Sequence, residues 1–196
     1  MKFWRILVTG LPGTGKTTLC KHLKLRKNFF YLNVAELIKN EQIYNDFDTT
    51  RDCTIYDGER LYQRLDNLIT NELKEKRVVV DFHTLEDFAL KRWFNLIIIL
   101  HASSPLLEER YIARNYSSEK IIDNLALNQS QYILDVVYGY FDDTNQSYVK
   151  LPDDLTKAKE YAFSFDTTYI LERFSETSEQ MNKLLQDILI FLDNLV

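Results

Sequence analysis

A phosphate-binding loop is the first feature of the chain that indicates chemistry. Residues 10–17 read GLPGTGKT, which matches the pattern G-x-x-x-x-G-K-[ST]. Because glycine lacks a Cβ, the backbone of such a loop can turn its N–H groups inward toward an anion. Lys16 adds a positive charge, and Thr17 adds a hydroxyl suited to Mg²⁺. The pattern therefore predicts that the chain binds ATP through its phosphates.

The segments on either side of the loop fit this interpretation. The apolar run of residues 3–9 predicts a strand that ends at the loop, and a helix is predicted from Lys16 to about Arg26. The amino end of that helix would present its positive dipole to the phosphates. Thr18 either extends the phosphate contacts or caps the helix, and the sequence favours neither. The predicted nucleotide contacts in this region are Gly13, Gly15, Lys16, Thr17 and Thr18.

Charged residues farther along the chain are placed to act on the same nucleotide. Asp81 lies near the end of the apolar run 77–82, where a carboxylate can hold Mg²⁺ near the loop, so Thr17 and Asp81 are the predicted metal ligands. His83 either orients water or a phosphate, or is an ordinary loop histidine. Arg110 and Arg114 share one helical face, and they either reach the triphosphate or form a solvated surface.

Composition narrows the class of protein. The 196 residues suit one domain, 1–196, and the formal net charge of −5 argues against broad binding to nucleic acid or to an anionic membrane. An acidic surface instead favours a basic protein partner. The two cysteines indicate no disulfide framework, and no apolar run approaches the length of a membrane span. The apolar stretch at the amino end is too short for a signal peptide, so we expect an intracellular protein.

Strand-like and helix-like segments alternate, which predicts a parallel sheet covered by helices. The expected strands are residues 3–9, 29–32, 77–82, 94–100 and 169–174. The expected helices are residues 16–26, a short helix capped by Asn33, 61–73, a helix begun by Pro105, one long helix over 121–140, and 181–195. The polar stretch 45–57 lacks a period and is expected to be mobile and exposed. Residues 142–166 look like an insertion, partly helical around 155–163.

Several short motifs resemble the adenylate kinase isoenzyme 6 family, also known as the coilin-interacting nuclear ATPase, a small-subunit ribosome assembly factor. The resemblance covers roughly residues 3–140 and, more weakly, the last strand and helix. Besides the loop, the motifs are YLNV at 31–34, EQIY at 41–44, VVVDFH at 78–83, RWF at 92–94 and RNY at 114–116. The combination of the phosphate loop with D-x-H and R-W-F is specific, whereas each later motif alone is weak.

The resemblance implies an α/β P-loop NTPase fold with a five-stranded parallel sheet of order 2-3-1-4-5, like that of nucleoside monophosphate kinases. It implies a monophosphate-binding segment at about 33–56, a short lid at about 113–123, and an adenine-contacting turn at about 175–178. The implied catalytic residues are Lys16, Asp81, His83 and Arg114, with Asp81 and His83 forming a modified Walker B motif. Asn33 and Lys39 map to the monophosphate site, although the family usually has arginine in place of Lys39.

The family also implies a function. We expect a Mg²⁺- and ATP-dependent nucleoside monophosphate kinase, which converts ATP and AMP to two ADP, with ATPase activity and a role in small-subunit rRNA maturation. The implied partner is a basic ribosomal protein, and the implied locations are the nucleus and the cytoplasm. One alternative is an ATPase assembly switch without significant kinase activity. A nucleotide-binding module without turnover is a third possibility, and the intact set of Lys16, Thr17 and Asp81 argues against it.

Overall fold

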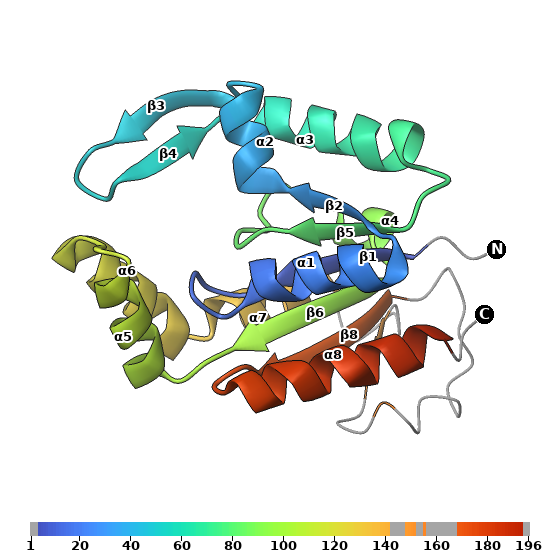
Figure 1. Ribbon diagram of the computed structural model, residues 1–196. Coiled ribbons are helices and arrows are strands. Elements are labelled where there is room, and N and C mark those ends of the chain that lie inside the picture. The colour runs from blue at the N-terminus through green and yellow to red at the C-terminus, as the bar shows by residue number, and fades with distance from the viewer. Residues whose placement is uncertain (1–3, 142–147, 152–154, 156–167, 194–196) are drawn as a thin grey trace.

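A parallel sheet of six strands forms the centre of the computed structural model, which describes residues 4–141, 148–151, 155 and 168–193. Its strand order is β2-β5-β1-β6-β8-β7 (Figure 1). The strands are β1 (Arg5–Thr9), β2 (Phe30–Asn33), β5 (Val78–Asp81), β6 (Leu96–His101), β7 (Tyr148–Lys150) and β8 (Thr168–Phe174). The predicted five-stranded order 2-3-1-4-5 is confirmed as β2-β5-β1-β6-β8.

The sixth strand is the difference from the predicted sheet. β7 lies in the stretch predicted to be an insertion and pairs in parallel with β8, with Val149 opposite Tyr169. It has only three residues and no buried side chain, so no apolar period marks it in the sequence. Of the predicted helical region 155–163, all but Leu155 lies outside the described residues.

Helices cover both faces of the sheet because alternate strand residues point to opposite sides. On one face α1 (Lys16–Lys27) and α8 (Ser178–Asp193) pack on the sheet (Figure 1). The other face is covered by α3 (Gly58–Asn67), the π-helix η1 (Leu68–Glu72), α4 (Leu90–Trp93), α5 (Ser104–Ala113) and α7 (Tyr132–Gly139). Ile98 of β6 packs with the first set of helices and Ile97 with the second. Both clusters end at the edge of the sheet where the phosphate loop leaves β1.

The polar stretch 45–57 forms regular structure instead of an irregular loop. After α2 (Val34–Asn40), whose amino end Asn33 caps as predicted, β3 (Tyr44–Asp48) and β4 (Cys53–Tyr56) make an antiparallel hairpin. None of its strand residues is buried, so the predicted exposure is confirmed. Without a buried face there is no alternation of apolar and polar residues, which is why the hairpin was missed from the sequence.

The long helix predicted over 121–140 is two helices. α6 (Ser118–Gln129) ends at Ser130, and α7 begins after Gln131, whose backbone is left-handed with φ 56°. The apolar period continues across this break because Leu125 and Val136 both contact the same core. Neither Gly nor Pro lies at the junction, so the apolar spacing in the sequence predicts one continuous helix.

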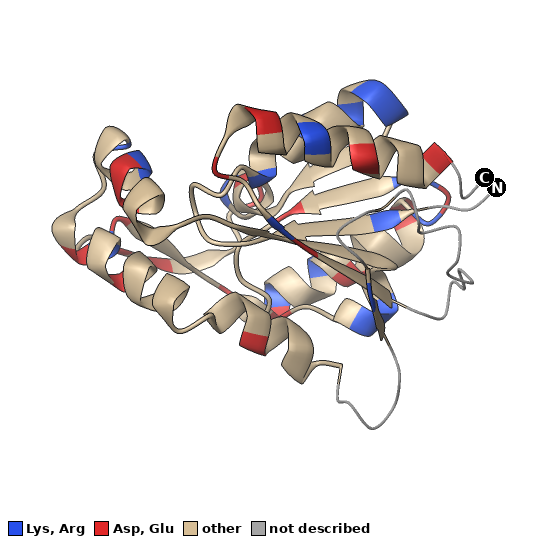
Figure 2. Ribbon diagram, turned by 90° about the horizontal axis from the view of Figure 1, so that it is seen from below, with Lys and Arg blue, Asp and Glu red and all other residues tan. Residues whose placement is uncertain are grey.

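Neither basic nor acidic residues dominate the side of the molecule that is seen from below in Figure 2. Basic and acidic residues are interspersed along several helices (Figure 2), and the chain carries a net charge of −5. Among the described helices, none has the length and apolarity that crossing a membrane requires.

Candidate active site

The phosphate loop follows β1 and leads directly into α1. Gly10 has φ 136°, and a Cβ at this position would lie 2.3 Å from the carbonyl oxygen of Leu100. Gly15 has φ 94°, and its Cβ would lie 2.6 Å from Cε of Met181. Glycine is therefore required at both ends of the turn, by backbone conformation and by the close approach of β6 and α8. The loop is fixed between the two helical layers.

Lys16 is folded back along this loop. Its Nζ donates hydrogen bonds to the carbonyl oxygens of Gly10 at 2.8 Å and Leu11 at 2.9 Å. The residue is 9% exposed, and desolvation of the ammonium lowers its pKa to about 8 against an opposing attraction from Asp81. A desolvated cation interacts strongly with an incoming phosphate, because little water screens the pair.

Asp81 connects the loop to the neighbouring strands. The buried carboxylate ends β5, and its Oδ2 accepts hydrogen bonds from the Thr17 hydroxyl at 2.6 Å and the Tyr31 hydroxyl at 3.1 Å. The Tyr31 oxygen in turn accepts a hydrogen bond from Nδ2 of Asn33 at 3.2 Å. Desolvation, followed by the charge of Asp81, raises the pKa of Tyr31, so the phenol stays protonated and donates.

The oxygen atoms around Asp81 suit a magnesium ion. Among the described residues no group of three or more His, Cys, Asp or Glu side chains could hold a metal by themselves. Mg²⁺ in phosphate-transfer sites uses one or two protein oxygens and completes its shell with water and phosphate. Thr17 and Asp81, in contact beside the phosphate loop, match that donor set.

His83 lies two residues beyond Asp81 and is exposed. Its ring contacts the edge of Phe82, with ring centroids 5.1 Å apart. Although part of the side chain is exposed, neighbouring protein atoms remove much of the water around the imidazole ring. This desolvation, together with the positive charges of Lys16 and Lys120, lowers the pKa of His83, so the ring is neutral at pH 7. A neutral imidazole two residues along the chain from Asp81 can both donate and accept a hydrogen bond.

Arg110 of α5 and Arg114, which caps the end of that helix, line a cavity of about 460 Å³ beside the loop. Arg110 donates to the carbonyl oxygen of Gly13 at 2.6 Å and to that of Ser175 at 3.3 Å, so it joins the loop to the turn after β8. Arg114 is exposed at the cavity and makes no such bond within the described chain. The cavity lining also includes Gly13, Gly15, Thr18, Ser175, Thr177, Ser178 and Met181.

The loop, the strand-end carboxylate and the arginine-lined cavity lie together at one edge of the sheet. Comparisons with known proteins identify the class of protein to which this arrangement belongs. A family model described as an AAA domain matches residues 6–132, which places that region in the AAA domain family. A Plasmodium falciparum protein named adenylate kinase isoenzyme 6 homolog is 32% identical over 153 residues, 71% of this chain and 81% of the relative. The chain belongs to the adenylate kinase isoenzyme 6 family. A Caenorhabditis elegans protein of the same name is 27% identical over 86% of this chain and 94% of the relative.

Solved structures confirm the fold of this adenylate kinase isoenzyme 6 family member. A sugar kinase from Janibacter matches with a TM-score of 0.58 and 13% identity, over 98% of this chain and 95% of that one. A shikimate kinase from Acinetobacter baumannii in complex with shikimate matches with a TM-score of 0.56 and 18% identity, over the same shares of the two chains. At these identities the likeness shows the P-loop kinase fold alone.

The two residues that the family resemblance assigns to the monophosphate site lie in different surroundings. The Asn33 side chain caps α2 by accepting from the Glu36 amide at 3.1 Å, and it also donates to Tyr31. It therefore supports Asp81 through Tyr31. Lys39 is exposed in the last turn of α2, without a hydrogen bond or ion pair in the described part of the chain. Its assignment to the monophosphate remains a prediction.

Tyr31 received no role from the sequence, although it donates to the carboxylate at the centre of the site. β2 pairs with β5 in a register that sets Asn33 opposite Asp81, and this brings residues 50 positions apart into contact. A tyrosine two residues before the end of a strand is a weak signal, because strands are generally rich in tyrosine.

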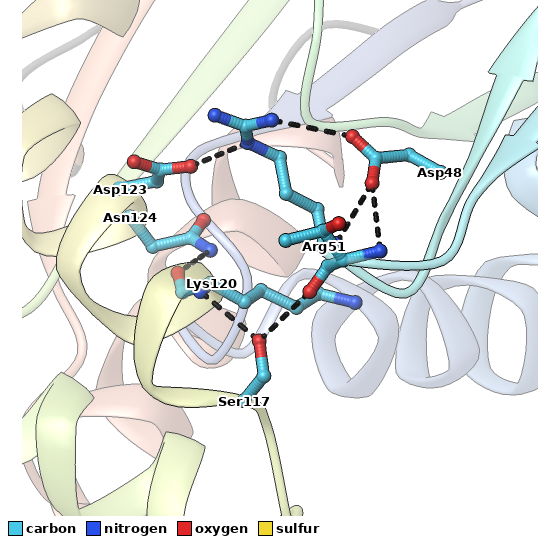
Figure 3. Close-up of polar contacts among 7 residues, drawn as sticks. Asp48, Arg51, Ser117, Lys120, Asp123 and Asn124 are labelled. Atoms are coloured by element: carbon cyan, nitrogen blue, oxygen red, sulfur yellow. Dashed lines mark hydrogen bonds and ion pairs between the residues drawn. The ribbon is translucent and has the colours of Figure 1, made fainter.

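The turn of the β3–β4 hairpin contacts the predicted lid (Figure 3). Nε of Arg51 lies 2.7 Å from the Asp123 carboxylate. Nζ of Lys120 donates to the carbonyl oxygen of Asp52 at 2.6 Å. The Ser117 hydroxyl also donates to the carbonyl oxygen of Thr50 at 3.3 Å. The predicted monophosphate-binding segment and the predicted lid therefore meet directly. Asn115, within the predicted lid, has a left-handed backbone with φ 56°, which asparagine tolerates better than most residues.

Proposed function

We propose that the chain transfers the γ-phosphoryl group of ATP to AMP or a related nucleoside monophosphate, producing two nucleoside diphosphates. The observation that carries this proposal is the contact of Thr17 with Asp81 beside the loop-bound Lys16, at the edge of an arginine-lined cavity. Two relatives support the reaction class by their names. One is the Plasmodium relative described above, and the other is a putative adenylate kinase from Methanocaldococcus jannaschii, which is 30% identical over 79% of this chain and 85% of the relative.

The proposed mechanism needs no nucleophilic side chain, because an oxygen of the acceptor phosphate attacks the γ-phosphorus as the bond to the β-phosphate oxygen breaks. The loop amides and Lys16 orient the β- and γ-phosphates, and Arg114 stabilises charge on the transferring group. Thr17 and Asp81 would hold Mg²⁺, which when bound neutralises phosphate charge. Asn33 and Lys39 are the proposed contacts of the monophosphate. Closure of the lid would exclude water and align the reacting atoms.

The arginine-lined cavity is proposed to hold the nucleoside of ATP. Its volume of about 460 Å³ lies within the range of small-ligand sites, and it opens beside Gly13 and Gly15 of the phosphate loop. Ser175 and Ser178, which the family resemblance maps to the adenine-contacting turn, belong to its lining. We therefore assign this cavity to the donor nucleotide and the hairpin side of the loop to the acceptor.

ATP hydrolysis is a second proposed activity, supported by the position of His83. A neutral imidazole two residues from Asp81 can orient a water molecule toward the γ-phosphate. From the family resemblance we also propose a role in small-subunit rRNA maturation, with a basic ribosomal protein as partner, in the nucleus and the cytoplasm. The net charge of −5 is compatible with such a partner. An ATPase switch without kinase activity is the alternative proposal.

A coupled assay separates these activities. We expect ADP production with Mg²⁺ and ATP to rise strongly when AMP is added, whereas release of inorganic phosphate should not rise with it. Equal phosphate release with and without AMP, together with no extra ADP, would leave only the ATPase. Bound ATP without any turnover would support a binding module and contradict both enzymatic proposals.

Replacing His83 with glycine tests the hydrolytic role. We expect His83→Gly to lower ATP hydrolysis at least about tenfold, because the attacking water loses its orienting group. Affinity for a fluorescent ATP analogue should change less than about twofold, since the ring contributes little to binding in this proposal. His83→Gln, which keeps a hydrogen-bonding group, should recover part of the rate. A matched loss of hydrolysis and binding would assign His83 a structural role.

A further inference from the structure

A second cavity lies next to the start of the phosphate loop and shares no lining residue with the arginine-lined cavity. It has a volume of about 350 Å³ and forms where the ends of β6 and β8 meet the junction of α6 and α7. Its apolar wall consists of Leu11, Leu100, Leu127, Ile133, Leu134 and Phe174. A pocket of this size with a largely apolar wall and a few polar groups has the usual composition of a small-molecule site.

Two acceptor groups of this cavity, on His101 and Glu172, face each other without a donor between them. Nε2 of His101 is buried and has no hydrogen-bond partner within the described part of the chain. It lies 3.9 Å from Oε2 of Glu172, too far for a direct hydrogen bond. The other carboxylate oxygen, Oε1, is already taken by Lys150 and by the Tyr138 hydroxyl. A single donor group placed between Nε2 and Oε2 could reach both atoms.

The charge state of His101 is set by its surroundings. Desolvation lowers its pKa, the Glu172 carboxylate opposes this, and Lys150 adds to it. The ring is therefore neutral at pH 7, and with its proton on Nδ1 it presents Nε2 as an acceptor. Asn128 adds a third acceptor, because its Nδ2 already donates to the Ala102 carbonyl oxygen and to Ser104 while its Oδ1 accepts no bond from the described residues.

We propose that this cavity is a second ligand site, which takes a compact aromatic ligand carrying an amidine or amino group. The ring would occupy the apolar wall, and the N–H groups would bridge Nε2 of His101 and Oε2 of Glu172. A carboxylate of the same shape is excluded, because it would bring a second negative charge to Glu172 and leave Nε2 without a donor.

The site is positioned to act on nucleotide binding. Gly10 and Leu11 line it, and the carbonyl oxygens of these same residues accept the hydrogen bonds of Lys16. Gln131, at the break between α6 and α7, lines it too. We expect a ligand packed against Gly10 and Leu11 to favour the loop conformation in which Lys16 bonds to their carbonyl oxygens. Occupation of the cavity should then weaken ATP binding, and ATP should weaken the ligand by the same factor.

Benzamidine is a suitable probe, with benzoate as the matched anion. We expect saturation-transfer NMR on the full chain to show benzamidine binding in the millimolar range or tighter and no binding of benzoate. Leu134→Trp, which fills the cavity, should abolish binding, and Glu172→Gln should weaken it at least about fivefold. Leu25→Trp is the control for adding an indole, because Leu25 is 80% exposed and does not line this cavity. Equal binding of the two probes, or binding unchanged in both cavity variants, would overturn the proposal.

The effect on nucleotide binding distinguishes this site from the arginine-lined cavity. As benzamidine saturates, the affinity for a non-hydrolysable ATP analogue should fall by about fivefold and then level off. A fall that continues in proportion to benzamidine concentration would indicate direct competition and overturn a separate site. An unchanged analogue affinity, with benzamidine bound, would overturn the coupling. These readouts depend only on binding, so they are independent of whether AMP proves to be the acceptor.

Discussion

Replacing Lys16 with alanine should lower the turnover of ATP by at least about a thousandfold, with or without AMP. The ammonium is almost fully buried against the loop that is proposed to hold the β- and γ-phosphates, and no other lysine in the described chain bonds to that loop. Its loss would leave the charge that develops during transfer without its main cationic partner. Single-turnover measurements at saturating ATP would separate this effect from weaker binding.

The control for this variant is Lys21→Ala, which removes an exposed lysine from the same helix.

A second readout is the pH dependence of binding. Because the pKa of Lys16 is about 8, the free protein loses this charge as the pH rises through that value. Affinity of the wild type for an ATP analogue should then fall above pH 8, and Lys16→Ala should lack this fall. Activity retained in Lys16→Ala would show that phosphate transfer occurs elsewhere.

Changing Asp81 to asparagine should lower turnover by about a hundredfold and raise the Mg²⁺ concentration needed for half-maximal rate. The amide oxygen can still accept the hydrogen bonds that Thr17 and Tyr31 give to Oδ2, so the local structure should persist. The negative charge that attracts Mg²⁺ is removed. Titration of activity with Mg²⁺ at fixed ATP measures both effects.

Asp135→Asn provides the comparison, because Asp135 is exposed on α7 and makes no ion pair with the described residues. Thermal unfolding of both variants should stay close to that of the wild type. If Asp81→Asn lowered the rate without changing its Mg²⁺ dependence, the carboxylate would act on something other than the metal. In that case Tyr31 and His83 would be the next positions to change.

The phosphate loop and the order of the central strands could be predicted from the sequence because their signals are local. The glycines, Lys16 and Thr17 form one octapeptide, and strands buried on both faces appear as continuous apolar runs. The β3–β4 hairpin and the break at Gln131 left no such signal. The hairpin buries neither face, and the apolar period runs unbroken across the two helices.

Contacts between distant parts of the chain could not be predicted in this way. Tyr31 reaches Asp81 through strand pairing, and Arg110 binds Gly13 across 97 positions. The sequence placed Arg110 and Arg114 on one helical face as candidate partners of the triphosphate, and the family resemblance favoured Arg114. In the structure Arg110 is already engaged by the loop and the turn after β8, which leaves Arg114 as the guanidinium available to a nucleotide.

The contact of Arg51 with Asp123 has a consequence for how substrates enter. Since the hairpin turn and the first turns of α6 hold each other, neither segment can swing outward without breaking the same bonds. If the proposed donor and acceptor sites are correct, opening for one nucleotide would also open the path for the other, so the two would be expected to bind cooperatively. Both charged partners are exposed, so ionic strength would tune this gate. The ease of nucleotide entry would then depend in part on an ion pair at the surface of the protein.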